Sequence, residues 1–504
     1  MKIERFNPIR YRLILSLILL ASLALTGFAP SGLARARGGA QQQGPAGQSM
    51  KGAKLKGKVP VNKEVLKVNL PKARETTLKN GLKVIVLEGF NKVPTFSMQM
   101  VILSGGLADP KDQHGLASFT ASLLREGAGK RTSREIAEQI DTLGATLSAG
   151  AGLSSLTSTV SASGLVENLD TVLDIFADVV RNPTFPKEEI EKYKARLISQ
   201  LQLQRSNPQF LAAERFSRVI YGDHPAGLVS PPVESVKKAT AEDLARFHST
   251  HYVPNNAMLA VVGDVTLKDL LPKIEREFGD WKRGDVPKVE IPAAPSQSES
   301  RIHLIDRPGS VQTVLQLGNL AIERTSPDYF SVLVMDKIVG GGPAARLFMN
   351  LREEKGYTYG AYSFFGGSKY RGTWQASSNV RTEVTDPAMK EFMYELKRIR
   401  DEKVSDYELE NAKRALVGSF ALSLEQPQSL LQNIITQKLF NLPADYWDTY
   451  PQKVAAVTAE DVQQAARKYV DLAHLQIVAV GDASKIREAM AKYGKVEVYD
   501  AEGK

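Results

Sequence analysis

Ser118 and Ser122 are the first polar side chains whose spacing could bring them together for chemistry. The apolar residues around them recur at helical spacing, which predicts an amphipathic helix from Gly115 to about Glu126. Residues four apart share one face of a helix, so the two hydroxyls lie together with Ala121 beside them. A neutral hydroxyl is a poor metal ligand, and a methyl group cannot accept a proton. This helix face therefore offers neither a metal site nor a catalytic base.

The stretch nevertheless resembles the first active-site helix of the pitrilysin/insulinase family of zinc peptidases, the inverzincins. In that family the frame reads G-x-x-H-x-x-E-H, with two histidine ligands and a glutamate base. The resemblance places Ser118 at the first histidine, Ala121 at the glutamate and Ser122 at the second histidine. The family's third ligand is a glutamate on a later helix, and the segment EKYKARLISQLQ places Gln200 there.

All four of these groups differ from the family pattern at once. A catalytic zinc ion needs about three imidazole, thiolate or carboxylate ligands and an activated water. A zinc site with one changed ligand could still bind the metal. The loss of the base and of every ligand predicts a degenerate site that binds no zinc. We therefore expect no metal and no other cofactor in this chain, and expect zinc in a catalytic partner.

The six histidines offer only one close pair, His248 and His251, as a displaced metal site. A spacing of three without a nearby third ligand is a weak signal, so surface or interface histidines are the preferred reading. His114 precedes the predicted helix, and His224 is expected in a loop. The sequence shows no Ser/His/Asp or Cys/His arrangement, no phosphate-binding glycine loop and no basic–aromatic patch.

A second stretch, IVGGGPAARLFMNLREEKGYTYGAY, begins at Ile338. Its glycines and proline predict a turn-rich loop, and the apolar residues that follow predict a helix. Gly356 is well placed to end that helix, because glycine readily takes the left-handed conformation after the last turn. Tyr357 to Phe364 is then predicted as a strand.

The same segment order occurs in the family, with an arginine near the helix end and a tyrosine seven residues later. Arg352 and Tyr359 have that spacing. The resemblance implies that the pair binds the substrate backbone and stabilises the tetrahedral intermediate formed at the zinc, for which a guanidinium and a phenol are suitable donors. The alternatives are an ordinary solvated helix arginine and a plain sheet tyrosine. The loop of Gly340, Gly341 and Gly342 either contacts a peptide or is a tight strand-to-helix connection.

The chain contains an internal duplication. Thr240-Ala-Glu-Asp243 recurs 218 residues later as Thr458-Ala-Glu-Asp461, and each copy precedes a helical pattern and an apolar strand that ends in Gly-Asp. Two further matches lie 219 residues apart: Glu189-Ile-Glu191 with Glu408-Leu-Glu410, and Pro208-Gln209 with Pro427-Gln428. Two similar halves of roughly 220 residues are therefore predicted.

Each half opens with strand-like alternation, followed by long helical patterns. This order predicts an α+β fold in which each half is a mostly antiparallel sheet packed with helices. We expect the halves at residues 65–284 and 301–504, joined by a proline-rich linker at 285–300. The family resemblance, which extends from about Pro71 to Tyr499, implies that the two halves form a clamshell-like chamber.

The N-terminus predicts export. Residues 1–36 combine a basic start, an apolar run from Leu13 to Leu25 and a small-x-small site at Ala34-Arg35-Ala36, as in a secretory signal peptide. An uncleaved anchor is the alternative. Residues 37–64 are rich in basic residues, glycine and glutamine and are expected to form a disordered tether. The periplasm is the expected location, with secretion as the other option.

The distribution of charge along the chain indicates which classes of binding partner to expect. The chain carries a net charge of +9, but residues 1–36 hold five basic residues and one acidic residue, and residues 37–58 hold five basic residues and no acidic one. The remainder is near neutral, which argues against a nucleic acid partner. Contact with a membrane is expected at most through the basic tail.

These observations together suggest a non-catalytic subunit of an exported peptidase of this type. A zinc-bearing chain of the same family would be its partner in a heterodimer, and peptides or unfolded polypeptide would be the substrate. Two alternatives remain: a scaffold, assembly or peptide-binding protein with no part in proteolysis, and a peptidase that acts alone through an unrecognised site.

Overall fold

The computed structural model describes residues 64–89 and 93–503, which belong to one compact unit. The predicted signal peptide lies outside the described residues, as does nearly all of the predicted tether. None of the helices in the described part is both long and apolar enough to cross a membrane.

The first sheet has six strands, which run in the order β1-β2-β8-β3-β7-β6. All neighbouring strands are antiparallel except β2 and β8, which are parallel. The strands are β1 (Arg74–Thr77), β2 (Lys83–Glu88), β3 (Thr95–Ile102), β6 (Thr146–Ala151), β7 (Ser158–Leu165) and β8 (Ala257–Gly263).

The second sheet repeats this plan in the order β11-β12-β10-β13-β9-β14. The β9–β13 pair is parallel, as its counterpart β2–β8 is in the first sheet, and β14 also runs parallel to β9. The predicted mostly antiparallel sheets and the two homologous halves are thus confirmed. The strands are β9 (Arg301–Asp306), β10 (Gln312–Leu320), β11 (Thr358–Phe365), β12 (Thr373–Arg381), β13 (Gln476–Gly481) and β14 (Lys495–Tyr499).

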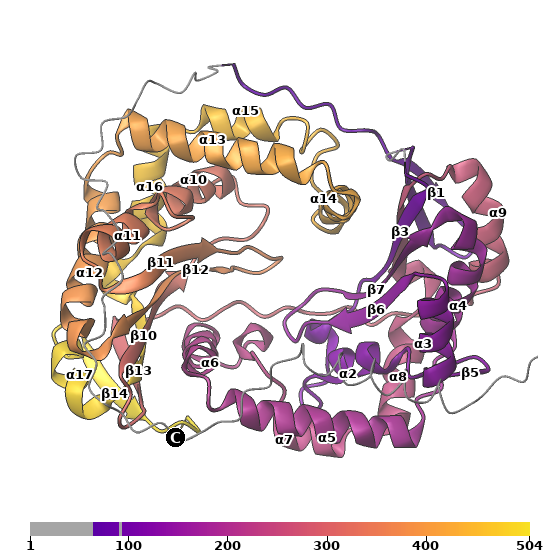
Figure 1. The fold of residues 1–504 in the computed structure, drawn as a ribbon, viewed down its shortest axis with the longest axis horizontal. Helices are drawn as coiled ribbons and strands as arrows, with labels where there is room; N and C mark the ends of the chain where they lie inside the picture. Colours follow the sequence, from indigo (N-terminus) through magenta and orange to yellow (C-terminus); the bar gives the residue numbers. More distant parts are fainter. Residues whose placement is uncertain (1–63, 90–92, 504) are drawn as a thin grey trace, which may run out of the picture. The chain divides into compact units, whose positions relative to one another are not determined.

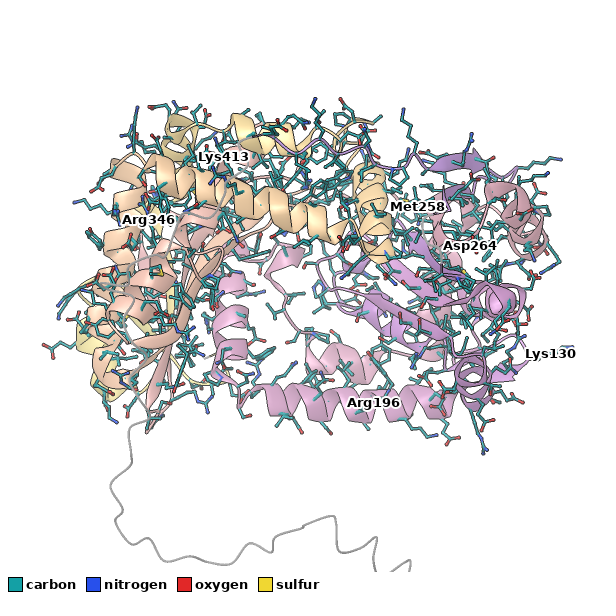
Figure 2. All side chains as sticks on the ribbon, turned by 45° about the horizontal axis from the view of Figure 1, so that its top comes forward. Lys130, Arg196, Met258, Asp264, Arg346 and Lys413 are labelled. Carbon is teal, nitrogen blue, oxygen red and sulfur yellow. The ribbon has the colours of Figure 1, made fainter. Side chains whose placement is uncertain are left out.

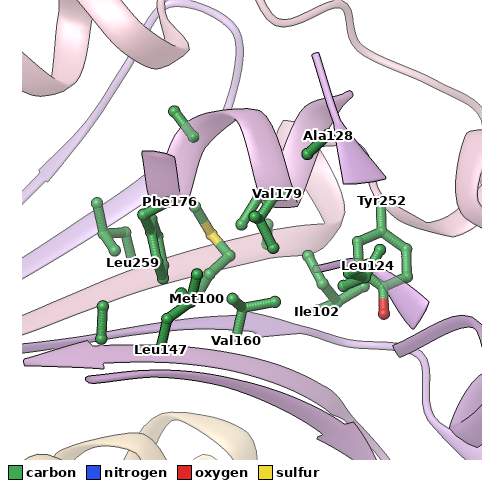
Figure 3. Close-up of a cluster of buried hydrophobic side chains, with 14 of the residues drawn as sticks. Met100, Ile102, Leu124, Ala128, Leu147, Val160, Phe176, Val179, Tyr252 and Leu259 are labelled. Carbon is green, nitrogen blue, oxygen red and sulfur yellow. The ribbon is translucent and has the colours of Figure 1, made fainter. Parts of the chain in front are cut away.

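Helices pack on one face of the first sheet and form its core. Strand residues Met100 and Val160 meet Phe176 and Val179 of the helix Leu169–Arg181 there (Figure 3). The helices of this half are α2 (Leu116–Leu123), α3 (Ser133–Thr142), α4 (Leu169–Arg181), α5 (Lys187–Gln204), α6 (Pro208–Tyr221), α7 (Val233–Lys238), α8 (Ala241–His251) and α9 (Leu267–Phe278). A two-stranded ribbon joins β4 (Gly127–Ala128) and β5 (Arg131–Thr132).

The second half has its own core around Trp374, which is fully buried. Between the two halves, residues 281–300 form no helix or strand. The helices of the second half are α10 (Tyr329–Val339), α11 (Arg346–Phe348), a π-helix (Met349–Glu354), α12 (Thr385–Asp401), α13 (Asp406–Ser423), α14 (Pro427–Leu439), α15 (Tyr450–Ala456), α16 (Ala459–Tyr469) and α17 (Ala483–Met490).

The repeated motifs of the sequence occupy equivalent places. Thr240 and Thr458 are the N-caps of α8 and α16, and each forms a capping box with the aspartate three residues on. Pro208 and Pro427 begin α6 and α14, where a missing backbone N–H has no cost. The duplication therefore repeats local hydrogen bonding as well as topology.

The two halves exchange these last helices. Leu430, Leu431 and Ile435 of α14 pack on the face of the first sheet that its own helices leave uncovered (Figure 1). Leu211, Ala212 and Phe216 of α6 pack in the same way on β10 and β13 of the second sheet. Each half therefore completes its core with a helix from the other half.

This exchange predicts that the α14 contact contributes strongly to stability. Ile435→Ala removes a side chain that is only 3% exposed, so we expect a loss of about 2–5 kcal/mol from the transfer and cavity costs together. Gln432→Ala, at an exposed position of the same helix, is the matched control. Denaturant midpoints measured for both variants test the exchange, and equal midpoints would contradict it.

Candidate functional site

The helix that carries the two serines begins at an unusual cap. Gly115 has a φ of 95°, and a Cβ atom there would lie 2.8 Å from Pro231, so glycine is required. Asp109 caps the helix from outside, because its carboxylate accepts the N–H of Gly115 at 2.6 Å and that of Ala117 at 2.7 Å. Burial of Asp109 raises its pKa to about 7 against these hydrogen bonds. The helix ends at Leu123, somewhat earlier than predicted.

Ser118 and Gln200 line one cavity of about 260 Å³ between α2 and α5. Ser122 lies one turn further along α2 and is partly buried, whereas Ala121 is fully buried. We name this space the uncharged cavity, because none of its lining residues carries a charge. Its lining is Gly115, Ser118, Phe119, Ala151, Gly152, Leu153, Tyr193, Leu197, Gln200, Leu201, Gln204, Val229, Ser230 and Pro231.

The groups gathered at this place do not fit a zinc ion. Ser118 offers a neutral hydroxyl, Gln200 a neutral amide and Ala121 a methyl group, whereas zinc requires imidazole, thiolate or carboxylate ligands. No cluster of three or more histidine, cysteine, aspartate or glutamate side chains that could hold a metal occurs among the described residues.

The prediction that His248 and His251 lie at the surface or an interface is wrong. They are only 8% and 7% exposed. His248 Nε2 is 2.8 Å from the carbonyl oxygen of Val180, and the His248 ring stacks on Tyr252 at 4.7 Å. Burial lowers the pKa of His248 to about 4. Both residues are therefore core histidines, which the apolar residues on their helix could have indicated.

In the second half, α11 continues directly into a π-helix, which the sequence pattern did not predict. Gly356 then takes a φ of 65°, as expected for a residue that ends the helix. Arg352 lies in the π-helical turn, where its guanidinium carbon is 4.7 Å from the ring centre of Phe348. Its side chain is 45% exposed, and its Nε lies 3.5 Å from the carboxylate of Glu353. The guanidinium is thus held in place by an aromatic ring and still accessible.

Tyr359 lies on β11, the edge strand of the second sheet, and is 89% exposed. The pairing of β11 with β12 is irregular between Thr358 and Ala361, so a bulge surrounds Tyr359. The π-helix leads into β11 through Gly356 and Tyr357, which brings Arg352 and Tyr359 to adjacent elements. The phenol is free to contact another molecule.

The loop of Gly340, Gly341 and Gly342 joins two helices, α10 and α11, so the expected strand-to-helix connection is wrong. The N–H groups of Gly340 and Gly341 both donate to the carbonyl oxygen of Asp336, at 3.0 and 2.9 Å. The carbonyl of Gly340 accepts the N–H of Ser363 at 3.0 Å, and a Cβ at Gly340 would lie 2.2 Å from that nitrogen. Two of the three amides are therefore already bonded within the chain.

Asp336 was not identified from the sequence. Its carboxylate accepts the hydroxyl of Ser363 at 2.6 Å and the indole N–H of Trp374 at 3.1 Å. It thereby ties α10 and the glycine loop to β11 and β12. Burial raises the pKa of Asp336 to about 6, although both hydrogen bonds oppose the shift. A lone acidic residue within the apolar run VLVMDKIV was the available signal.

Asp336 should make stability depend on pH. Because the folded-state pKa is raised from 3.8 to about 6, the carboxyl contributes most stability below pH 4 and loses it as the pH rises through 6. The expected loss is about 3 kcal/mol. We expect Asp336→Asn to weaken the fall in unfolding midpoint between about pH 4.5 and pH 7.5. The exposed Asp401→Asn is the control, and an unchanged pH dependence in Asp336→Asn would contradict the assignment.

Two descriptions of one peptidase family match this chain. Residues 84–229 match "Insulinase (Peptidase family M16)", and residues 238–416 match "Peptidase M16 inactive domain". Together the two matches span more than half of the chain. The second match includes Arg352, Tyr359 and the glycine loop.

Individual relatives and solved structures indicate the same peptidase family. A protein of Bacillus subtilis (strain 168) named an uncharacterized zinc protease is 24% identical over 394 residues, which cover 78% of this chain and 94% of that protein. A crystal structure described as the peptidase M16 inactive domain from Pseudomonas fluorescens is 27% identical, with a TM-score of 0.74, and the match covers 82% of this chain and 98% of that chain. The crystal structure of a protease from Helicobacter pylori is 20% identical, with a TM-score of 0.75, and the match covers 82% of this chain and 100% of that chain. At this identity the similarity supports the fold alone. This chain therefore belongs to the insulinase, or M16, family of peptidases.

Proposed function

We propose that this chain is the non-catalytic, substrate-binding subunit of an exported M16-type zinc peptidase. One observation supports the proposal most: the family resemblance assigns the zinc and base positions to Ser118, Ala121, Ser122 and Gln200, while Arg352 and Tyr359 match the family's arginine and tyrosine and are exposed. A chain that has the arginine and tyrosine but lacks the zinc ligands and the base can assist proteolysis only if another chain supplies the zinc.

In this proposal the partner binds zinc and supplies the attacking water, and this chain completes the chamber around the peptide. Arg352 and Tyr359 donate hydrogen bonds to the substrate backbone and to the oxyanion that develops during attack. The π-helix and the β11 bulge hold these donors before the substrate arrives, which is what electrostatic stabilisation requires. The glycine loop contributes indirectly, by fixing β11 through Ser363.

The proposal is tested by recovering the native partner. The full chain, with residues 1–36, is tagged at its C-terminus, expressed in its own cell and purified with whatever it binds, and the complex is assayed for cleavage of an unfolded polypeptide. We expect a partner of the same family that brings zinc, together with cleavage that a chelator stops. Recovery of a stable complex without zinc and without cleavage would support the scaffold alternative instead.

A further inference from the structure

A second cavity in the described part of the chain is distinct from the uncharged cavity. It has a volume of about 1040 Å³, at the upper end of the roughly 300–1,000 Å³ range usual for ligand sites. Its walls are β1, β2 and the start of β8 with Met258 (Figure 2), the second half of α14, and the segment from Val286 to Ile291. Residues of both halves thus enclose one space, which we name the inter-half cavity.

Three lysines converge on the inter-half cavity from separate segments. Lys83 begins β2, and strand alternation puts it on the same face as Ile85 and Leu87, which contact α14. Lys72 lies just before β1. Lys369 comes from the β11–β12 loop.

The segments that carry Lys72 and Lys369 are fixed to the opposite half. The N–H of Leu70, near Lys72, donates to the carboxylate of Asp448 at 2.9 Å. The hydroxyl of Tyr370, beside Lys369, donates to the carbonyl of Ser154 at 3.2 Å. The positions of Lys72 and Lys369 at the cavity are therefore held by packing between the two halves.

These three charges are not compensated. Within the described residues, Lys72, Lys83 and Lys369 form no ion pair, whereas Lys438 at the same cavity pairs with Glu75 at 2.7 Å. Glu75 and Asp448 are the acidic residues of the lining. The cavity therefore carries an excess of positive charge in a body that is near neutral as a whole.

The rest of the lining is apolar or neutral. Leu103 is 38% exposed there, and Val286, Val289 and Ile434 add further apolar surface. The lining also includes the neutral amide of Asn433, whose nitrogen is buried without a hydrogen-bond partner. A ligand that matches these walls carries carboxylates and apolar groups.

We propose that the inter-half cavity binds acidic peptide segments that also contain apolar residues. The inference rests on the proposed function, because it names the class of substrate that this subunit would hold. The unpaired lysines attract the carboxylates, and the leucine and valine surface receives the apolar side chains. Acidic stretches of an unfolded polypeptide would then be held away from Arg352 and Tyr359, which contact the backbone to be cleaved.

Fluorescence anisotropy on the isolated chain tests the inference without a partner. The probes are three labelled peptides of equal length and equal leucine content, with glutamate, glutamine or lysine at the remaining positions. We expect the glutamate peptide to bind roughly tenfold more tightly than the glutamine peptide at low salt and to lose that advantage as salt screens the charges. Equal affinity for the three peptides, or binding of none, would overturn the inference.

Substitution locates the site. The triple variant Lys72→Gln, Lys83→Gln and Lys369→Gln should lose the glutamate preference and leave the glutamine peptide unaffected. The control triple variant, Lys79→Gln, Lys130→Gln and Lys268→Gln, removes the same charge at exposed positions outside the cavity and should bind as the unchanged chain does. An equal loss of the glutamate preference in both triple variants would show that the peptide does not bind at the inter-half cavity.

Cleavage of the glutamine peptide by the mixed complex with its zinc-bearing partner reports the proposed function separately. If that peptide is cleaved while the lysine variants change nothing, the inferred site fails and the subunit role stands. If the lysine effect is found but no cleavage occurs with any partner, the proposed function fails and the acidic peptide site stands.

Discussion

Replacing Ser118 and Ser122 by histidine and Gln200 by glutamate should convert a chain without bound zinc into one that binds about one zinc ion per molecule. The two new imidazoles would lie one helical turn apart on α2, and the new carboxylate would enter the cavity that Ser118 already lines. Three such ligands and a water are what a catalytic zinc site contains. Ala121 is left unchanged, because it is fully buried and its position supplies no ligand.

The control for this variant moves the carboxylate and keeps both histidines. Gln202→Glu in place of Gln200→Glu points away by about 200° on the same helix, and Gln202 does not line the uncharged cavity. Metal content after dialysis should be near one zinc ion per chain for the first variant and far lower for the control. A folded first variant that stays free of zinc would show that α2 and α5 no longer keep the family geometry.

Removing the guanidinium of Arg352 should cost the mixed complex about 10²–10³-fold in kcat, as loss of one preorganised oxyanion donor does. Arg352→Ala takes away a donor and a charge held above the Phe348 ring, so the developing oxyanion loses its partner. Tyr359→Phe removes only one hydroxyl and should cost less. Arg352→Lys keeps the charge and loses the planar fork, so it should restore only part of the rate.

Arg352→Ala also separates the two main interpretations of this chain. Because the side chain is half exposed and its nearest ion-pair partner among the described residues is Glu353 at 3.5 Å, its removal should leave folding and assembly intact. Tyr394→Phe, at another exposed tyrosine of the same half, is the control for Tyr359→Phe. Steady-state kinetics on the mixed complex provide the measurement. Full activity of Arg352→Ala would contradict the substrate-binding role and support the scaffold interpretation.

The sequence predicted the fold well where its signals were local. Strands such as β2, β8 and β13 are apolar runs ended by glycine or acidic residues, and the threonines that begin α8 and α16 are unambiguous caps. The duplication then fixed the number of halves. The exchange of α6 and α14 could not be predicted, because an apolar helix face does not state which sheet it will cover.

The site was only partly predictable. The family resemblance assigned Ser118 and Gln200 to two zinc-ligand positions on separate helices, and in the structure both residues line one cavity. Burial of His248 depends on its contact with Val180 of α4, and the bond from Ser363 to the glycine loop joins residues distant in the chain. Lys369 of the inter-half cavity is far in the chain from Lys72 and Lys83, so only the folded structure brings the three lysines together.

We would first measure the zinc-to-protein ratio of the purified mature chain together with its peptidase activity on an unfolded polypeptide. The chemistry of Ser118, Ala121, Ser122 and Gln200 predicts no bound zinc and no cleavage by this chain alone. About one zinc ion per chain, with cleavage that a chelator abolishes, would instead show that this chain is a zinc peptidase in its own right.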